Sequence, residues 1–150
     1  MRRILLVFSF LVSGSMLLLS QAPERPDFSG TWRLEAAGSV EVTTFHQDAS
    51  RIRIIMRISD SAGKRELEMS GEIDGKPHRQ TVLGYGCTLT AQWFGDSLVW
   101  EVRRESVQGT FDNRRIMTLS GHDSFHATRT RLAPGPISSW EETWTRVSGE

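Results

Sequence analysis

Hydrophobic and polar residues alternate along most of the chain that follows residue 27. An alternation of period two is typical of β-strands that bury one face and expose the other. In the segment RIRIIMRI, residues 51–58, apolar side chains share one face and arginines share the other: Ile52, Ile54, Met56 and Ile58 against Arg51, Arg53 and Arg57. Turn-forming residues interrupt the alternation every eight to twelve residues, a spacing that favours a β-sandwich or a β-barrel.

The segments 51–58 and 65–73 are predicted to pair as an antiparallel hairpin about the turn DSAG. The second segment again separates two faces, with Leu67, Met69 and Ile73 on one and Glu66, Glu68 and Glu72 on the other. Pairing would place the arginines beside the glutamates on the solvent face, where opposite charges favour one register. Because carboxylates are available to neutralise them, the arginines indicate a solvated charge ladder rather than an anion-binding site.

Glycines mark the next turns along the chain. IDGKP predicts a hairpin at Asp74-Gly75. A single long strand is expected over 78–93, with a bulge or sharp bend at Gly84 and Gly86. The turn FGDS is expected to pair apolar residues across two strands, Trp93 with Leu98 and Ala91 with Trp100.

The complete pattern predicts an all-β fold. Strands at GTWRLE and VEVTTF precede the hairpin, and three further strands are expected over 113–120, 124–132 and 138–147. Short connections make sequence neighbours sheet neighbours. The predicted architecture is therefore an antiparallel up-and-down meander of about 8–9 strands, which closes into a barrel and so removes its exposed edges.

The N-terminal segment 1–22 predicts a signal peptide. Arg2 and Arg3 precede an apolar run over 4–19, which is shorter than the roughly 20 residues of a membrane-spanning helix, and small residues follow it. An uncleaved membrane anchor is the alternative. Removal of this segment leaves residues 23–150 as a single domain without a membrane span, exported to a periplasmic or extracellular location.

Composition narrows the class of partner. The chain has 18 basic and 18 acidic residues, and without Arg2 and Arg3 its net charge is near −2. No basic surface is expected, which argues against nucleic acid as a partner. The single cysteine, Cys87, lies among apolar neighbours in YGCTL and is expected to be buried. A monomer is predicted.

FSGTWRLE near the start of the domain and WTRV near its end resemble the lipocalin and fatty-acid-binding group, the calycins. In those barrels a Gly-x-Trp on the first strand places the indole at the closed end, and a basic residue of the last strand lies across it. The resemblance implies a lipocalin-like barrel and assigns Gly30, Trp32 and Arg146 to structural closure of the barrel. An indole gains from a guanidinium on its face. The layout is also similar to small exported bacterial proteins that begin DFSGTW and lack a defined function.

Two positions depart from the fatty-acid-binding pattern. Those proteins usually have a tyrosine two residues after the arginine, where this chain has Ser148. They also have a helical lid after the first strand, whereas AAGS leaves room only for a turn. Both departures argue against a fatty-acid carrier in the strict sense.

No catalytic motif is present in the sequence, and a non-enzymatic protein without a cofactor is predicted. His122 and His126 flank Asp123 in GHDSF, but a metal site needs at least three well-placed protein ligands, so no metal site is predicted. Asp74, Asp96 and Asp123 are interpreted as turn formers.

Aromatic and aliphatic side chains on the inward faces form a candidate ligand cavity, lined by Ile54, Met56, Leu67, Met69, Tyr85, Leu89 and Trp100. A small barrel is just wide enough either to be filled by side chains or to hold one small ligand. The predicted function is non-catalytic binding of a small apolar or amphipathic molecule inside the barrel. The alternative is a protein-interaction or inhibitor module of the cell envelope with a filled barrel.

Overall fold

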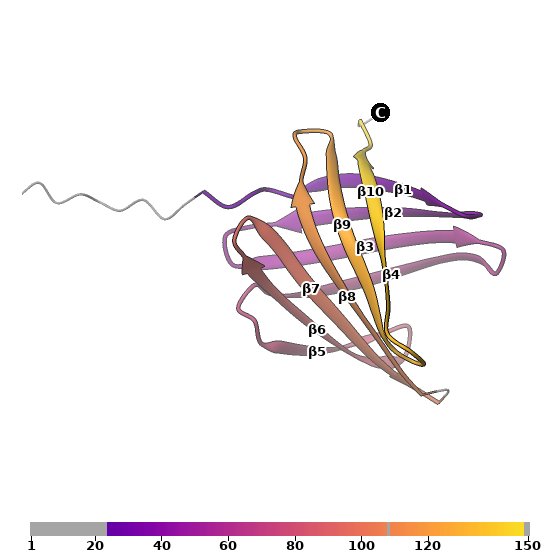
Figure 1. Cartoon of the computed structure of the whole chain (residues 1–150). Helices are drawn as coiled ribbons and strands as arrows, with labels where there is room; N and C mark the ends of the chain where they lie inside the picture. Colours follow the sequence, from indigo (N-terminus) through magenta and orange to yellow (C-terminus); the bar gives the residue numbers. More distant parts are fainter. Residues whose placement is uncertain (1–23, 108, 149–150) are drawn as a thin grey trace, which may run out of the picture.

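A computed structural model describes residues 24–107 and 109–148, and these form one antiparallel sheet of ten strands (Figure 1). The predicted signal peptide, 1–22, lies outside the described residues. The strands are β1 (Gly30–Ala36), β2 (Ser39–Gln47), β3 (Arg51–Asp60), β4 (Gly63–Glu72), β5 (Pro77–Val82), β6 (Tyr85–Phe94), β7 (Ser97–Ser106), β8 (Gly109–Leu119), β9 (Ser124–Ala133) and β10 (Ser138–Arg146).

The sheet curls into a nearly closed barrel. Its strand order is β4-β3-β2-β1-β10-β9-β8-β7-β6-β5, so the first and last strands of the chain, β1 and β10, pair in the middle of the order. Every other neighbouring pair is a hairpin of consecutive strands. The predicted all-β meander is confirmed, with ten strands in place of the expected eight or nine.

The additional strand comes from a wrong prediction over 78–93. The expected bend is a complete hairpin, because β5 ends at Val82 and β6 begins at Tyr85. The two residues between them both have positive φ, 50° at Leu83 and 79° at Gly84. Positive φ at both central positions is the geometry of a tight two-residue turn, whose twist matches that of the flanking strands.

The predicted hairpin at Asp74-Gly75 is also wrong, although the turn itself is present. β4 and β5 are the two ends of the sheet order, and no backbone ladder joins them among the described residues. Gly75 N instead donates to Ala91 O, on β6, at 2.8 Å. Across this seam the Gln80 side chain takes the place of a backbone partner, since its Oε1 accepts from Ser70 N at 3.0 Å and its Nε2 donates to Ser70 O at 3.1 Å.

The charged hairpin of β3 and β4 has the predicted register. Arg57 lies opposite Glu66, and Arg53 Nε lies 2.7 Å from Glu68 Oε1 on the exposed surface. Ile52 and Ile54 point inward and are buried. The predicted pairs Trp93–Leu98 and Ala91–Trp100 are present in β6 and β7.

Aromatic side chains fill one end of the barrel. Phe125 contacts Trp32 edge-on, with 4.9 Å between ring centroids, and stacks on Trp144 at 5.4 Å. Phe28 and Phe45 complete the cluster, and all five side chains are buried. Phe28 belongs to the segment that enters the barrel ahead of β1, and its carbonyl accepts a hydrogen bond of 2.8 Å from the Trp32 indole.

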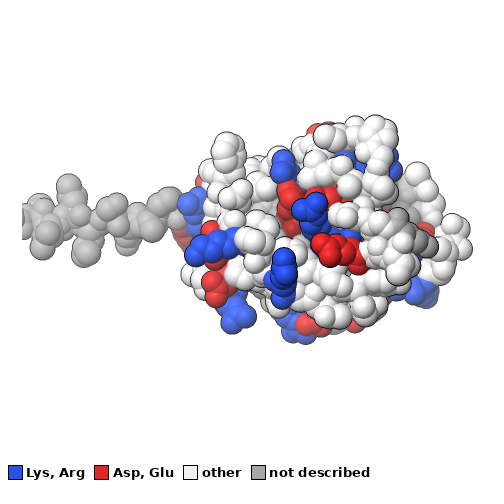
Figure 2. Space-filling view, turned by 90° about the horizontal axis from the view of Figure 1, so that it is seen from below, with Lys and Arg blue, Asp and Glu red and all other residues white. Residues whose placement is uncertain are grey.

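The outer surface mixes both signs of charge, and Figure 2 shows basic and acidic side chains interspersed on the face seen from below. Among the described residues, no helix has the length and hydrophobicity needed to cross a membrane.

Cys87 is buried as predicted, with its Sγ 4.0 Å from Met69 Sδ. Burial raises the pKa of this thiol, against a smaller opposing influence of Arg104.

Candidate functional site

The contact between Trp32 and Arg146 closes the aromatic end of the barrel. The two residues lie opposite each other on β1 and β10, and Arg146 Cζ lies 4.1 Å from the indole centroid. The guanidinium also donates to two carbonyls, Ser29 O at 2.8 Å and His122 O at 2.7 Å. These bonds join the start of β1 to the turn between β8 and β9, so Arg146 is fully engaged in structure.

Gly30 is required beside this contact. Its φ is 122°, and a Cβ at this position would overlap Arg146 Nη1. The glycine therefore leaves the space that the guanidinium needs in order to reach Trp32. This close approach is the physical reason for a Gly-x-Trp at the start of the barrel.

The opposite end of the barrel contains a cavity of about 260 Å³. This is the end where β5 turns into β6 and β7 turns into β8. Most of its wall is apolar, with arginines and one asparagine among the lining residues: Met56, Ile58, Arg65, Leu67, Met69, Val82, Cys87, Trp100, Val102, Arg104, Phe111, Asn113 and Arg129.

The seven residues predicted to line a cavity occupy three different places. Met56, Leu67, Met69 and Trp100 line the cavity. Ile54 and Leu89 are fully buried in the packed interior away from it. Tyr85 does not line it and is 40 % exposed. As the first residue of β6 it follows the turn directly, and its ring lies at the rim beside Arg104, whose Cζ is 5.6 Å from the ring centroid.

Arg104 supplies the cavity wall with a free hydrogen-bond donor. Its Nε is buried and has no partner in the described structure. Its guanidinium lies between two rings, with Cζ 5.6 Å from the centroids of both Tyr85 and Phe111. A buried donor without a partner is uncommon in native proteins and is readily satisfied by a ligand acceptor.

A buried ion network lies inside the barrel and shares Arg129 with the cavity lining, and sequence reasoning missed it. Arg115 on β8 makes a bidentate pair with Glu41 on β2, at 2.8 and 2.9 Å. Arg115 Nε also lies 3.1 Å from Glu142 Oε2, on β10. All three side chains are buried, and the Arg115 guanidinium lies over Trp144, with Cζ 4.9 Å from the ring centroid.

Arg129 links this network to the cavity. Its Nη1 lies 3.4 Å from Glu142 Oε1 and 3.6 Å from Glu41 Oε2, while its Nε donates to Asn113 Oδ1 at 3.3 Å. Glu142 also accepts from the indoles of Trp140 and Trp144, at 3.2 and 3.1 Å. The network contains two arginines and two glutamates, so its charges balance.

Burial and pairing have opposite effects on the pKa values of the network. Burial raises the pKa of Glu41, but Arg115, with smaller contributions from Arg129 and Thr43, outweighs this and holds the pKa below its usual range. Burial lowers the pKa of Arg115, and the two glutamates more than compensate, so it is raised. Arg129 has a lowered pKa because of burial and repulsion by Arg115. The ionised state of the Arg115–Glu41 pair is therefore favoured.

The alternation of inward and outward side chains along β2 and β8 indicates which charged residues belong to this network. In SVEVTTF, Glu41 shares the inward face with Thr43 and Phe45, both buried. Arg115 likewise alternates with Asn113 and Met117 on the inward face of β8. A charged residue on the apolar parity of a strand indicates a buried partner elsewhere, but parity alone does not identify it.

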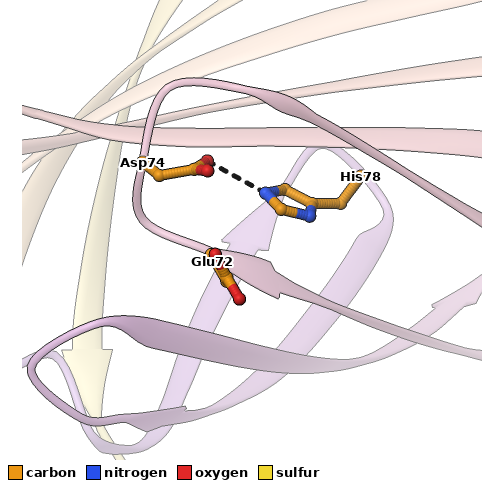
Figure 3. A group of neighbouring side chains, drawn as sticks. All are labelled: Glu72, Asp74 and His78. Carbon is orange, nitrogen blue, oxygen red and sulfur yellow. Dashed lines mark hydrogen bonds and ion pairs between the residues drawn. The ribbon is translucent and has the colours of Figure 1, made fainter.

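A second cluster of potential ligands lies at the seam between β4 and β5. Ligand atoms of Glu72, Asp74 and His78 all lie within 4.8 Å of one another. Figure 3 shows Asp74 and His78 facing each other, joined by a hydrogen bond of 2.9 Å. Asp74 Oδ1 also accepts from Lys76 N at 2.9 Å, and the bond to His78 is the main cause of the lowered pKa of Asp74. These contacts are those of a turn-forming aspartate, as interpreted from the sequence.

Of the histidines weighed as ligands, His126 is exposed, and its Nδ1 lies 3.2 Å from the Thr143 hydroxyl. His122 is exposed in the turn between β8 and β9, and its carbonyl accepts a hydrogen bond from Arg146. The structure therefore does not group these two histidines with a third ligand among the described residues.

No protein-family model matches the chain, and no curated protein matches its sequence. Solved structures do match its fold. Secretory abundant heat soluble protein 4 from Ramazzottius varieornatus is 12 % identical, with a TM-score of 0.59, over 86 % of this chain and 100 % of that one. Human cRBP IV is 15 % identical, with a TM-score of 0.56, over 81 % and 99 %.

A mutant of the fluorescent protein UnaG is 11 % identical, with a TM-score of 0.54, over 81 % of this chain and 97 % of that one. These neighbours are barrels of the lipocalin and calycin type. The fold is a lipocalin-like barrel. At these identities the likeness establishes the fold alone.

Proposed function

We propose that this chain is a non-catalytic binding protein that holds a small apolar or amphipathic molecule in its barrel. The observation that carries the proposal is the cavity between β3, β4, β7 and β8, which is walled mainly by apolar side chains. Concave apolar sites with a few polar groups are the usual form of small-molecule sites. At about 260 Å³, this cavity lies just below the usual range of about 300–1,000 Å³ and suits a single small ligand.

The polar contact for the ligand would come from Arg104. Arg115 is paired with Glu41 and Glu142 and lies outside the cavity lining, and Arg146 is engaged with Trp32 at the opposite end. Arg104 is the lining arginine with a buried, unpartnered Nε among the described residues. An amphipathic molecule with a carboxylate or other acceptor near the mouth fits this arrangement. Affinity in the micromolar range with loose specificity is expected, because burial of apolar surface would dominate binding.

Titration with an environment-sensitive apolar dye tests this proposal, with Trp100 quenching as a second signal. Val102→Phe places extra volume in the cavity wall, and Val99→Phe, on the other face of β7, is the matched control. We expect saturable binding to wild type and to Val99→Phe, and at least tenfold weaker binding to Val102→Phe. Absence of saturable binding to wild type, or equal affinity in both variants, contradicts the proposal.

The alternative is a protein-interaction or inhibitor module with a filled barrel. The aromatic end is filled in this way, but the opposite end contains the cavity, which favours the ligand-binding function. Competition of the bound dye by lipids and by aromatic acids would distinguish ligand classes, and native mass spectrometry of protein from its own host would detect a molecule that co-purifies.

Export, processing and oligomeric state belong to the same proposal. We propose that residues 1–22 are removed as a signal peptide, that the remaining chain acts as a periplasmic or extracellular monomer, and that it is related to exported bacterial proteins that begin DFSGTW. The basic, apolar and small-residue segments of the N-terminus support export. N-terminal mass determination on fractionated host cells, with sedimentation analysis, tests these points.

A further inference from the structure

Three hairpin turns at the cavity end each present an exposed aliphatic side chain. Leu83 is 58 % exposed between β5 and β6, Val107 is 97 % exposed after β7, and Ile137 is 71 % exposed just before β10. Exposed apolar residues grouped at one place on a soluble domain mark an interaction surface. We refer to Leu83, Val107 and Ile137 as the apolar tips.

The apolar tips lie side by side at one level of the barrel. Cys87 pairs with Arg104, so the β5–β6 turn, a few residues before Cys87, is level with the end of β7. Asp112 pairs with Ala133, which places the start of β8 level with the β9–β10 turn. Alternate hairpins of one sheet are about 10 Å apart. The three turns lie together at the lower right of Figure 1.

Leu83 has a backbone conformation that is unusual for an aliphatic residue. Its φ of 50° belongs to the left-handed region, which favours glycine or asparagine. A leucine in this conformation costs free energy. Burial of its side chain does not offset that cost, because the side chain is mostly in solvent. The fold therefore gives no reason for this residue, whereas an external apolar surface does.

Two arginines without a carboxylate partner in the described structure lie near the mouth of the cavity beside the apolar tips. Arg104 and Arg131 carry inward side chains near the ends of β7 and β9, and the described structure shows no ion pair of either with a carboxylate. Several exposed arginines elsewhere on the barrel are paired with carboxylates, as Arg53 is with Glu68 and Arg114 with Glu101. The cavity end thus combines protruding aliphatic side chains with unpaired guanidinium groups.

We propose that this end of the barrel docks on a lipid bilayer that contains anionic headgroups. Aliphatic side chains at separate protruding turns can enter a soft interfacial layer together, and arginines beside them gain from an anionic surface. Docking in this orientation would turn the cavity mouth towards the membrane. The inference goes beyond ligand binding and does not depend on it, since the apolar tips lie outside the cavity lining.

Vesicle co-flotation tests the proposal on protein purified from its host, with whatever N-terminus the host leaves on it. Vesicles of phosphatidylcholine with phosphatidylglycerol are compared with vesicles of phosphatidylcholine alone. The tip variant combines Leu83→Gln, Val107→Gln and Ile137→Gln. The matched control combines Phe94→Gln, Ile116→Gln and Val147→Gln, which remove three other exposed apolar side chains. Both variants carry the same N-terminus as wild type, so any contribution of residues 1–22 is equal.

We expect wild type to bind the anionic vesicles, and to bind them less at high salt because screening weakens the attraction. The tip variant should bind at least tenfold less, and the control variant should bind like wild type. Arg131→Gln should weaken binding to anionic vesicles about fivefold, with Arg53→Gln as its control. Dye binding in the cavity should be unchanged in the tip variant, which separates this proposal from the proposed function.

Three results would overturn membrane docking. These are no vesicle binding by wild type, equal loss in the tip and control variants, and full binding by the tip variant. Binding that is indifferent to headgroup charge and to Arg131→Gln would overturn the anionic part of the proposal. A protein partner captured through the apolar tips, without vesicle binding, would replace the bilayer as the occupant.

Discussion

Both the backbone conformation and the surrounding space require a glycine at position 30. Its backbone has a positive φ, and the space that a Cβ would occupy belongs to the guanidinium of Arg146. The same guanidinium lies over Trp32 and binds two carbonyls, so its position is determined by several contacts at once. At the scale of single residues, the start of the barrel is organised around this arginine.

Gly30→Ala should therefore destabilise the barrel more than the backbone alone requires. Gly63→Ala is a matched control, because Gly63 has a similar φ of 112° but open space around its Cβ position. We expect a loss of about 1–3 kcal/mol in the control from backbone strain and a clearly larger loss in Gly30→Ala, measured by urea unfolding. Equal losses would show that Arg146 moves aside freely.

At the scale of elements, the β3–β4 hairpin is held in register by its two faces. The inward isoleucines set the parity, and the exposed arginines and glutamates favour one pairing. Shifting the strand by one residue would expose the isoleucines, which makes the register strongly specified. The charges add little stability, because exposed ion pairs are screened by water.

Arg53→Glu should lower the thermal midpoint slightly, because it places a third negative charge among Glu66 and Glu68. Addition of Glu68→Arg restores the opposite charges and should recover most of the loss. The measurement is differential scanning calorimetry of the single and double variants. No recovery in the double variant would mean that Arg53 acts through packing of its aliphatic stem and not through charge.

The seam between β4 and β5 depends on one side chain. Gln80 replaces a missing backbone ladder with two hydrogen bonds to Ser70. Gln80→Ala should cost about 1 kcal/mol and speed hydrogen exchange at the Ser70 amide, measured by NMR. Arg79→Ala, an exposed change on the same strand, should leave both unchanged. Slow exchange at Ser70 in Gln80→Ala would show that the seam is closed by other contacts.

At the scale of the whole molecule, the buried ion network joins strands that are distant in sequence. Arg115 and Glu41 are 74 residues apart, and Glu142 completes the group from β10. Removing one member leaves the others charged, buried and partly unpaired, which is far more costly than losing the pair as a unit. The network therefore fixes β2, β8 and β10 relative to one another across the barrel.

Glu41→Gln should destabilise the protein by about 3–5 kcal/mol. Glu35→Gln is the matched control, since Glu35 lies on β1 with an exposed side chain paired to Arg33, and it should have almost no effect. Urea unfolding at neutral pH measures both. A loss in Glu41→Gln no larger than in the control would mean that the network relaxes by admitting water.

The same pair predicts a pH dependence. The pKa of Glu41 is lowered in the fold, so its contribution is present above the unfolded pKa and is lost as pH falls through the folded pKa. The stability difference between wild type and Glu41→Gln should shrink once the pH falls below about 4.3. Unfolding curves from neutral to acid pH measure it, and a difference that stays constant contradicts the assignment.

The sequence by itself determined most of the strands, the inward faces of the charged hairpin and the register of that hairpin. Each of these follows from local alternation, because successive side chains of a strand point to opposite faces whatever the strand packs against. The sequence also indicated the contact of Trp32 with Arg146, through the resemblance of its two terminal motifs to known barrels. The extra strand was missed because Leu83 does not look like a residue of a two-residue turn.

Only the tertiary structure decided where the barrel stays open, where it is hollow and which charges are buried together. Asp74-Gly75 has the local chemistry of a hairpin, yet its two strands are the ends of the sheet order and are joined through the Gln80 side chain in place of a backbone ladder. Alternation places Ile54, Met56 and Leu89 on inward faces alike, but packing fills the space around Ile54 and Leu89 and leaves it beside Met56. Parity marked Glu41 and Arg115 as inward, while their pairing required closure of the sheet, which brings together strands that no local pattern relates.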